Sequence, residues 1–254
     1  MATLNSNATR IGLALGGGFA RAIAHTGVLR VFEREGIPIH AISGVSSGAI
    51  AAAAFASGRT SIEIETAARA MQFSSVENLA SFAMGDFLRR LLKHSRFEEM
   101  LVPLAIVASD LTAGAPVVFK DKGDVLMPIY ASCAYPGLFP PVRYMDHCLV
   151  DGMVAMDVPA APLRRMGATH VVSVMLPSPP ETIDPRNMQS VVRRSFQIMM
   201  ERNGSHWRRA SDLVITPQVK DSFGDIRQMI EAGERAAEAA LPQILKWLHS
   251  AVAA

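Results

Sequence analysis

The sequence has little of what marks secreted, metal-binding and nucleic-acid-binding proteins. Its 254 residues include only two cysteines, Cys133 and Cys148, which is typical of a reducing compartment, and no metal-ligand spacing surrounds either. The formal net charge is only +2, and the arginine pairs are scattered, at positions 89–90, 164–165, 193–194 and 208–209. This pattern argues against nucleic-acid binding. Scattered arginine pairs are typical of solvated helix faces, and they are also compatible with a transient contact with an anionic membrane surface.

Signals for export and for membrane insertion are also lacking. The first ten residues, MATLNSNATR, have no charged start followed by an apolar run, so we expect no signal peptide and a cytoplasmic protein. Residues 36–58 carry no charge, but Pro38, His40 and several serines and glycines interrupt them. This stretch therefore divides into a strand, a turn and a helix rather than forming a membrane span.

Length and periodicity predict a single α/β domain over residues 10–254, preceded by a flexible N-terminus at 1–9. Half of the residues are hydrophobic, which suffices for one sizeable core. Short apolar runs indicate buried strands at Arg10–Leu15, His40–Ser43, Leu104–Ser109, His170–Leu176 and Asp212–Thr216. Helices are predicted at 20–35, Gly48–Ala56, 187–209 and 225–250. Strands that alternate with helices favour a mostly parallel sheet covered on both faces.

Residues 60–100 are predicted to be mostly helical, and they are rich in methionine and phenylalanine: Met71, Phe73, Phe82, Met84 and Phe87. Two interpretations remain open. These side chains either pack in the core or form a mobile apolar cover over a lipid site, since methionine-rich surfaces adapt to many ligands. Residues Pro177–Pro185 are predicted to form a surface loop.

A pattern that indicates a catalytic serine, G-x-S-x-G, occurs as Gly44-Val45-Ser46-Ser47-Gly48 between a predicted strand and a predicted helix. The backbone has to reverse sharply there, which strains the conformation of Ser46 and exposes its hydroxyl, and the flanking glycines let the two arms approach. The start of the helix also favours developing negative charge. Such patterns occur by chance, with Ser47 as an ordinary N-cap, but the strand-turn-helix context makes Ser46 the candidate nucleophile.

A glycine loop, Gly16-Gly17-Gly18-Phe19-Ala20-Arg21, leaves the first predicted strand and opens a helix. Its amide groups are suited to binding an anion. A dinucleotide-binding loop would have glycine where Arg21 stands, and no Walker-type lysine follows. The alternative is an oxyanion hole, which requires two or three amides aimed at a tetrahedral oxygen. Because this loop and Ser46 belong to the same short βαβ segment, the oxyanion hole is favoured.

A base for Ser46 is harder to identify from local sequence. None of the seven histidines stands in a telling motif: His25, His40, His94, His147, His170, His206 and His249. His25 and His40 fall in predicted secondary structure, where a structural role is expected. Asp151 ends a short apolar run and precedes Gly152, an arrangement that also fits an ordinary turn.

Taken together, these elements resemble the patatin-like phospholipases, in particular the short bacterial members. That family joins a glycine-rich oxyanion loop with a following arginine, a G-x-S-x-G turn, and a D-G-G or D-G-A motif that supplies the base. The corresponding segments here are Gly16–Arg21, Gly44–Gly48 and Asp151-Gly152-Met153. The resemblance extends over most of residues 10–240 and includes Val107–Leu111, Ala131–Pro141 and Ile226–Ala236.

The resemblance implies a three-layer α/β/α fold and a Ser–Asp dyad that hydrolyses lipid or fatty-acyl esters, with no metal or organic cofactor. Ser46 is then the nucleophile and Asp151 the general base and acid, on condition that Asp151 is desolvated. The amides of Gly17, Gly18 and Phe19 hold the oxyanion. Arg21 steadies the glycine loop and attracts a phosphate headgroup.

Three positions depart from the family pattern. Phe19 or Ala22 stands where glycine is usual, and we expect Phe19 to adopt a positive φ only with difficulty and to narrow the site. Met153 places bulk beside the base. Asp157 stands where asparagine is common before Val-Pro. These changes leave the dyad intact and bear on substrate size and rate.

Three alternative functions follow from the sequence. One is a Ser-His-Asp hydrolase using His170, His206 or His249, although such folds usually have several strands before the nucleophile. Another is a catalytically weak lipid-binding or regulatory module whose site is filled by Phe19 and Met153. The third is a nucleotide-binding protein that uses the glycine loop.

Overall fold

A computed structural model of the chain describes residues 9–70, 83–177, 183–203, 205–219 and 225–252. Most of the predicted flexible N-terminus lies outside these ranges. So do parts of the predicted cover and of the Pro177–Pro185 loop, namely residues 71–82 and 178–182.

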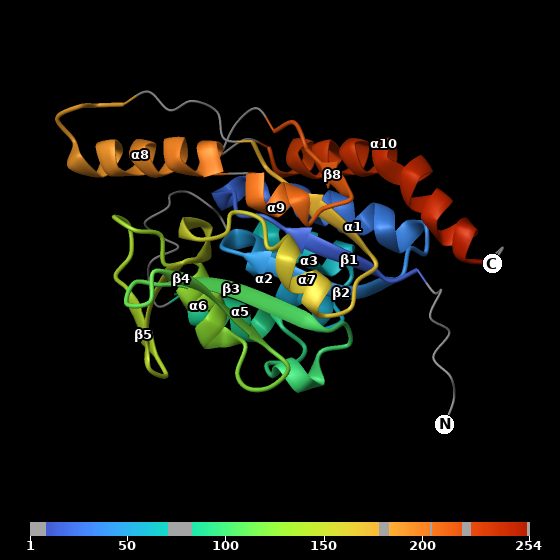
Figure 1. Cartoon of the computed structure of the whole chain (residues 1–254), viewed down its shortest axis with the longest axis horizontal. Helices are drawn as coiled ribbons and strands as arrows, with labels where there is room; N and C mark the ends of the chain where they lie inside the picture. Colours follow the sequence, from blue (N-terminus) through green and yellow to red (C-terminus); the bar gives the residue numbers. More distant parts are fainter. Residues whose placement is uncertain (1–8, 71–82, 178–182, 204, 220–224, 253–254) are drawn as a thin grey trace.

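An eight-stranded sheet forms the middle layer of the fold (Figure 1). Five parallel strands make up its larger part: β1 (Ile11–Leu15), β2 (Ile39–Val45), β3 (Leu104–Asp110), β7 (His170–Val174) and β8 (Leu213–Ile215). Three antiparallel strands lie at one side: β4 (Ala115–Lys120), β5 (Val142–Tyr144) and β6 (His147–Asp151). The order is β5-β6-β3-β2-β1-β7-β8, with β4 also paired to β3. The central strands β1 and β3 are buried along their whole length, as expected for strands covered on both faces.

Helices pack on both faces of this sheet. The larger core cluster lies against one face and includes side chains from α1 (Ala24–Arg34), α2 (Ser47–Ala56), α3 (Ser61–Ala70), α5 (Ala83–Leu91), α6 (Leu126–Ser132) and α10 (Ile226–Val252). A smaller cluster on the other face joins the sheet to α7 (Ala160–Arg165) and α9 (Ser205–Arg209). A further helix, α8 (Met188–Asn203), runs along the edge of the molecule in Figure 1.

The predicted three-layer α/β/α architecture with a mostly parallel sheet is confirmed. Two details differ. Strands β4, β5 and β6 are absent from the sequence-based prediction. β4 and β5 contain no buried residue, and in β6 only Leu149, Val150 and Asp151 are buried. The helix predicted at 20–35 begins with a 3-10 turn, η1 (Phe19–Ile23), before α1.

The described part of segment 60–100 packs into the core. Met84 is buried in the larger cluster and Phe87 packs against it, which matches the first of the two interpretations for these two side chains. Met71, Phe73 and Phe82 lie outside the described residues, and the cover over a lipid site remains a prediction. Within the described ranges, no helix is both long enough and apolar enough to cross a bilayer.

Candidate active site

Ser46 occupies the turn between β2 and α2 with φ 53° and ψ −134°, a strained conformation for a residue with a side chain. The flanking glycines are required by close packing. A Cβ on Gly44 would lie 2.5 Å from Ala49 Cα, and one on Gly48 would lie 2.4 Å from the carbonyl oxygen of Gly16. The turn brings the start of α2 against β2, as the G-x-S-x-G pattern predicts, and also against the end of β1.

Ser132, at the end of α6, supports this turn from behind. The backbone amide of Ser46 donates to Ser132 Oγ at 2.7 Å, and Ser132 Oγ donates to the carbonyl oxygen of Val107 in β3 at 2.6 Å. Ser132 is fully buried. Nothing in the local sequence singles it out; the available signal is its place inside the segment 131–141 that resembles the family.

Asp151 ends β6 beside β3, paired with Ala108, and is completely buried. Ser46 Oγ donates to its Oδ2 at 2.7 Å, and the amide of Met153 donates to its Oδ1 at 2.9 Å. Glycine is required at the next position, 152, because a Cβ there would lie 2.2 Å from the carbonyl oxygen of Val107. The structure therefore brings Ser46 and Asp151 into direct contact.

The surroundings of Asp151 change its acidity. Burial raises its pKa from 3.8 to about 7, against the opposing effect of the hydrogen bonds from Met153 and Ser46. A carboxyl group with this pKa gains and loses a proton near neutral pH, whereas an exposed aspartate remains ionised there.

The glycine loop between β1 and η1 lies directly beside Ser46. A Cβ on Gly17 would lie 3.0 Å from Ser46 Cβ, and the amide of Gly18 donates to Ser47 Oγ at 3.1 Å. His25 holds the start of the loop, with its Nε2 at 2.8 Å from the carbonyl oxygen of Gly16. Burial lowers the pKa of His25 to about 4, so its ring is neutral and Nε2 carries the proton that it donates. His25 thus has the structural role that its position predicts.

Phe19 has the unfavourable backbone conformation that the sequence predicts it to adopt only with difficulty, with φ 51°. Aromatic packing accompanies this strained backbone, because the Phe19 ring lies 5.0 Å from that of Tyr135, which in turn lies 6.2 Å from Phe196 of α8. Arg21 is buried in η1. Its predicted action on a phosphate headgroup stays a prediction.

The hydroxyl of Ser46 donates to Asp151, and the histidines of the alternative triad have other neighbours. His170 stacks on Trp247 with ring centroids 4.5 Å apart and contacts Thr169. His206 is exposed on α9 and lines a cavity together with Met153, and His249 is exposed near the end of α10. In the part of the chain that the structure describes, no group of three or more histidine, cysteine, aspartate or glutamate residues could hold a metal ion.

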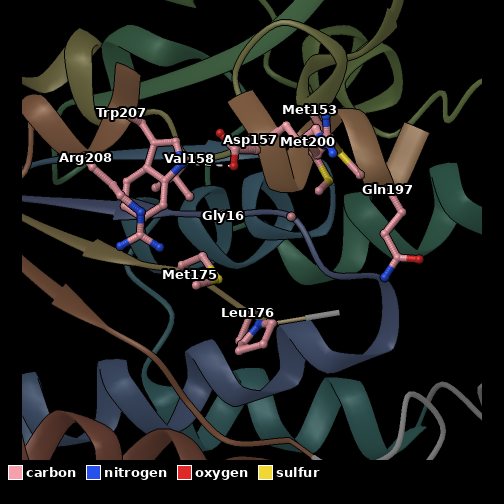
Figure 2. Close-up of a pocket in the computed structure, with 13 residues that line it drawn as sticks. Gly16, Met153, Asp157, Val158, Met175, Leu176, Gln197, Met200, Trp207 and Arg208 are labelled. Carbon is pink, nitrogen blue, oxygen red and sulfur yellow. Dashed lines mark hydrogen bonds between the residues drawn. The ribbon is translucent and has the colours of Figure 1, made fainter. Parts of the chain in front are cut away.

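Two neighbouring cavities approach the site from the side of α8 and α9. The larger, about 550 Å³, has Trp207 and Arg208 on one side and Met153, Met200 and Gln197 on the other (Figure 2). The smaller, about 330 Å³, shares Met153, Met200, Asp157 and Trp207 with it. Asp157, the departure from asparagine, accepts a hydrogen bond from Trp207 Nε1 at 2.9 Å, and burial raises its pKa.

Met153 lines both cavities and lies against the glycine loop beside the serine. Gly17 also lines the larger cavity, and a Cβ on Gly17 would lie 2.1 Å from Met153 Sδ, so the thioether rests on the glycine loop. Ser46 is 7% exposed and lines neither cavity. The side chain that the sequence predicts to add bulk beside Asp151 thus covers Gly17, the glycine next to Ser46.

These features define a class: an α/β protein with a serine at a strained strand-to-helix turn, a buried aspartate bonded to it, and a glycine loop beside both. The family model for patatin-like phospholipase matches residues 13–164, more than half of the chain, and the chain belongs to this family.

This chain spans half or less of the length of each of three relatives that it resembles in sequence. Patatin-like phospholipase domain-containing protein 6 of Mus musculus is 31% identical over 188 residues, which is 68% of this chain and 14% of the mouse protein. The lysophospholipase NTE1 of Cryptococcus neoformans is 32% identical over 194 residues, or 70% of this chain and 12% of that protein. An uncharacterised NTE family protein of Mycobacterium tuberculosis is 32% identical over 67% of this chain and 50% of its own length.

Solved structures share the fold at low sequence identity. VipD from Legionella pneumophila matches with a TM-score of 0.56 and 12% identity, over 93% of this chain and 67% of VipD. ExoU from the type III secretion system of Pseudomonas aeruginosa, solved with SpcU, matches with a TM-score of 0.51 and 14% identity, over 95% of this chain and 53% of ExoU. At such identities the likeness concerns the fold alone.

Proposed function

We propose that this protein is a serine hydrolase of acyl esters, acting on phospholipid, lysophospholipid or a related fatty ester. The observation that carries the proposal is the buried 2.7 Å hydrogen bond from Ser46 Oγ to Asp151 Oδ2, at a strained turn beside the glycine loop. Membership of a phospholipase family and the relative named a lysophospholipase support the choice of a lipid ester.

In the first half of the reaction, Ser46 Oγ attacks the ester carbonyl carbon while its proton passes to Asp151 Oδ2. The carbonyl oxygen becomes an oxyanion in the tetrahedral intermediate. When the intermediate collapses, the bond to the alcohol breaks and Asp151 returns the proton to the leaving alkoxide. This leaves the acyl group on Ser46 and Asp151 ionised.

In the second half, water attacks the acyl-serine. Asp151 accepts a proton from the water and then donates it to Ser46 Oγ as the fatty acid leaves. A carboxyl group with a pKa about 7 suits both steps, since it accepts a proton readily and gives it up readily at neutral pH.

The amides of Gly17, Gly18 and Phe19 are the proposed oxyanion donors. Gly17 lies against Ser46, and the amide of Gly18 now donates to Ser47 Oγ. In this mechanism the substrate oxyanion replaces the Ser47 hydroxyl as the acceptor for Gly18. Loss of one such donor typically costs on the order of a hundredfold in rate.

Hydrolysis by the purified protein tests the proposal. A panel of phospholipids, lysophospholipids and short p-nitrophenyl esters should give free fatty acid or p-nitrophenol. A fluorophosphonate should label Ser46, as read by mass spectrometry of the labelled peptide. Hydrolysis of none of these esters, together with no labelling of folded protein, would contradict the proposal.

One observation favours a second candidate, a lipid-binding or regulatory module with weak catalysis. Met153 lies over Gly17, and Ser46 is nearly inaccessible. For this candidate, the folded protein binds a fatty acid or lysophospholipid but neither turns over esters nor reacts with the fluorophosphonate. The two readouts together separate the candidates.

Activity is expected to rise with pH through about 7. Asp151 accepts the serine proton only when it is ionised, and burial places its pKa at about 7. We therefore expect kcat/KM for a soluble short-chain ester to fall about tenfold for each pH unit below 7 and to level off above it. Initial rates between pH 5 and 9 measure this profile, and a midpoint near that of an exposed carboxyl group, about 4, would argue against Asp151 as the base.

Shortening Met153 is expected to favour bulkier substrates. In Met153→Ala the thioether over Gly17 is removed, so kcat/KM for esters of bulky acids should rise relative to acetate esters by on the order of tenfold. Met175→Ala is the matched control, because Met175 also lines the larger cavity but is not the side chain resting on Gly17. Equal selectivity changes in the two variants would show that cavity volume, rather than the cover on Gly17, sets the preference.

A further inference from the structure

The exposed face of α8 carries large apolar side chains that do not pack in the core. Met188 is 72% exposed, Ile198 41% and Met199 55%. Ser195 and Arg202 are exposed as well. These five residues fall on one side of the helix at spacings of one and two turns, and we call them the outer face of α8.

The opposite side of α8 attaches the helix to the site. Ser190 and Gln197 are buried there, and Phe196 packs edge-on against Tyr135, the ring that also contacts Phe19. The helix therefore has a fixed inner face toward the glycine loop. Its outer face is the exposed side of the helix, and two of its residues, Met199 and Arg202, also line the two cavities. In Figure 1 the helix lies at the edge of the molecule.

The charge of this region is unlike that of the whole chain. Residues 183–209 contain six arginines, at 186, 193, 194, 202, 208 and 209, and two acids, Asp184 and Glu201, which gives a net charge of +4. The whole chain has a net charge of +2, so the remaining residues sum to −2. Among these arginines, four are exposed: Arg186, Arg202, Arg208 and Arg209. A helix with an exposed apolar stripe and exposed arginines beside it is suited to lie in the headgroup region of an anionic lipid surface.

An apolar path leads from this face toward Ser46. Met199 belongs to the outer face and also lines the smaller cavity, together with Val154, Phe196 and Met200. Val154 is itself 40% exposed. Met153, whose thioether rests on Gly17, lines the same cavity. A lipid chain that leaves the surface at Met199 thus meets mainly apolar side chains up to Met153, and Asp157 and His206 are the polar residues of the lining.

We propose that the outer face of α8 docks onto the surface of an anionic lipid assembly and delivers a lipid chain to the cavity beneath it. The docking follows from the apolar stripe and the arginines. Only the delivery of substrate to Ser46 rests on the proposed function. A lipid surface is the occupant because apolar side chains flanked by an excess of arginine match apolar chains beneath anionic headgroups.

Vesicle binding by the intact chain tests the docking. The protein carries Ser46→Ala so that vesicles are not hydrolysed, and binding is measured by flotation with phosphatidylglycerol–phosphatidylcholine vesicles and with phosphatidylcholine alone. We expect binding to the anionic vesicles that weakens with salt and that falls at least about tenfold in Met188→Asp and in Met199→Asp. Ile62→Asp is the matched control, because Ile62 is 67% exposed on α3 and should leave binding unchanged.

Other results of these measurements would contradict docking or assign the outer face of α8 to another partner. The docking proposal would be overturned if Met188→Asp and Met199→Asp bind the anionic vesicles as tightly as the parent protein does. This comparison requires that the melting temperatures of the variants match that of the parent. Concentration-dependent dimers in sedimentation velocity that dissociate in Met188→Asp, with no vesicle binding, would assign the face to a second copy of the chain. Hydrolysis of a soluble ester by the wild-type chain is measured separately. Docking without hydrolysis therefore counts against the proposed function alone, and hydrolysis without docking against this inference alone.

Discussion

Replacing Ser46 with alanine is expected to lower kcat/KM for ester hydrolysis by at least about a thousandfold, because the attacking oxygen is removed and only binding and the oxyanion donors remain. The fold should persist. Alanine and serine have similar backbone preferences at the positive φ of this turn, and the supporting bond from the Ser46 amide to Ser132 Oγ does not involve the side chain. The melting temperature and circular dichroism spectrum should therefore stay close to those of the wild type.

Ser57→Ala is the matched control for this loss. Ser57 is the fully buried residue at the other end of α2, and its hydroxyl donates to the carbonyl oxygen of Ala54 at 2.8 Å and accepts from the amide of Lys93 at 3.2 Å. Its removal should cost about 1 kcal/mol of stability and leave kcat/KM unchanged. Substantial activity in Ser46→Ala, after the protein has been purified free of host esterases, would remove Ser46 from the mechanism.

Replacing Asp151 with asparagine is expected to reduce hydrolysis by a similar factor while increasing stability at alkaline pH. An amide has almost the shape of the carboxylate, and its oxygen still accepts from the Met153 amide. It cannot take up the serine proton, and its NH₂ group would donate toward Ser46 Oγ instead of accepting from it. Chemistry should therefore fail in a protein that remains folded.

The stability change follows from the pKa of Asp151. Burial raises this pKa in the folded state from 3.8 to about 7, so the folded protein favours the neutral acid. As pH rises from about 4 to about 7, ionisation of the buried carboxyl costs folding stability, and above pH 7 the full cost is present. Asp151→Asn removes that cost, so its free energy of unfolding should exceed the wild-type value by a few kcal/mol at pH 8 and match it below pH 4.

Denaturant unfolding of the two proteins at pH 4 and pH 8 measures this difference. Asp146→Asn, at an exposed carboxyl on the turn between β5 and β6, should change neither activity nor the pH dependence of stability. A wild-type chain that is more stable than Asp151→Asn at pH 8 would mean that Asp151 is not held as a desolvated acid.

The strained turn that carries Ser46, the proposed nucleophile, could be predicted from the sequence because its signal is local. Gly44 and Gly48 are needed by contacts within a few residues of the turn and with the adjoining glycine loop. Asp151 is different, because 105 positions separate it from Ser46 and its contact with Ser46 depends on the antiparallel pairing of β3 with β6. Its local sequence fits an ordinary turn, so the family resemblance had to supply its role.

The parts of the site that the sequence did not predict depend on packing between distant segments. Bulk at Met153 was expected, but that its thioether rests on Gly17 depends on how η3 (Gly152–Val154) meets the glycine loop. Phe19 was expected to adopt a positive φ only with difficulty, and the ring contact with Tyr135 that accompanies it is invisible in sequence. Short strands with half-buried side chains, such as β5, carry too little apolar pattern to be recognised.

Strand β3 pairs with both of the strands that lead to the serine and the aspartate. Ser46 directly follows Val45, which pairs with Val107 of β3, and Asp151 pairs with Ala108, the next residue of β3. Because β4 pairs along the other edge of β3, strands β2 and β6 follow each other on one edge. The spacing of Ser46 and Asp151 is therefore set by consecutive positions along one strand, which are about 3.4 Å apart. The parts proposed to meet the substrate, Met153 and α8, lie outside strands β2, β3 and β6. Substitutions there are therefore expected to change substrate preference and to leave the contact between Ser46 and Asp151 intact.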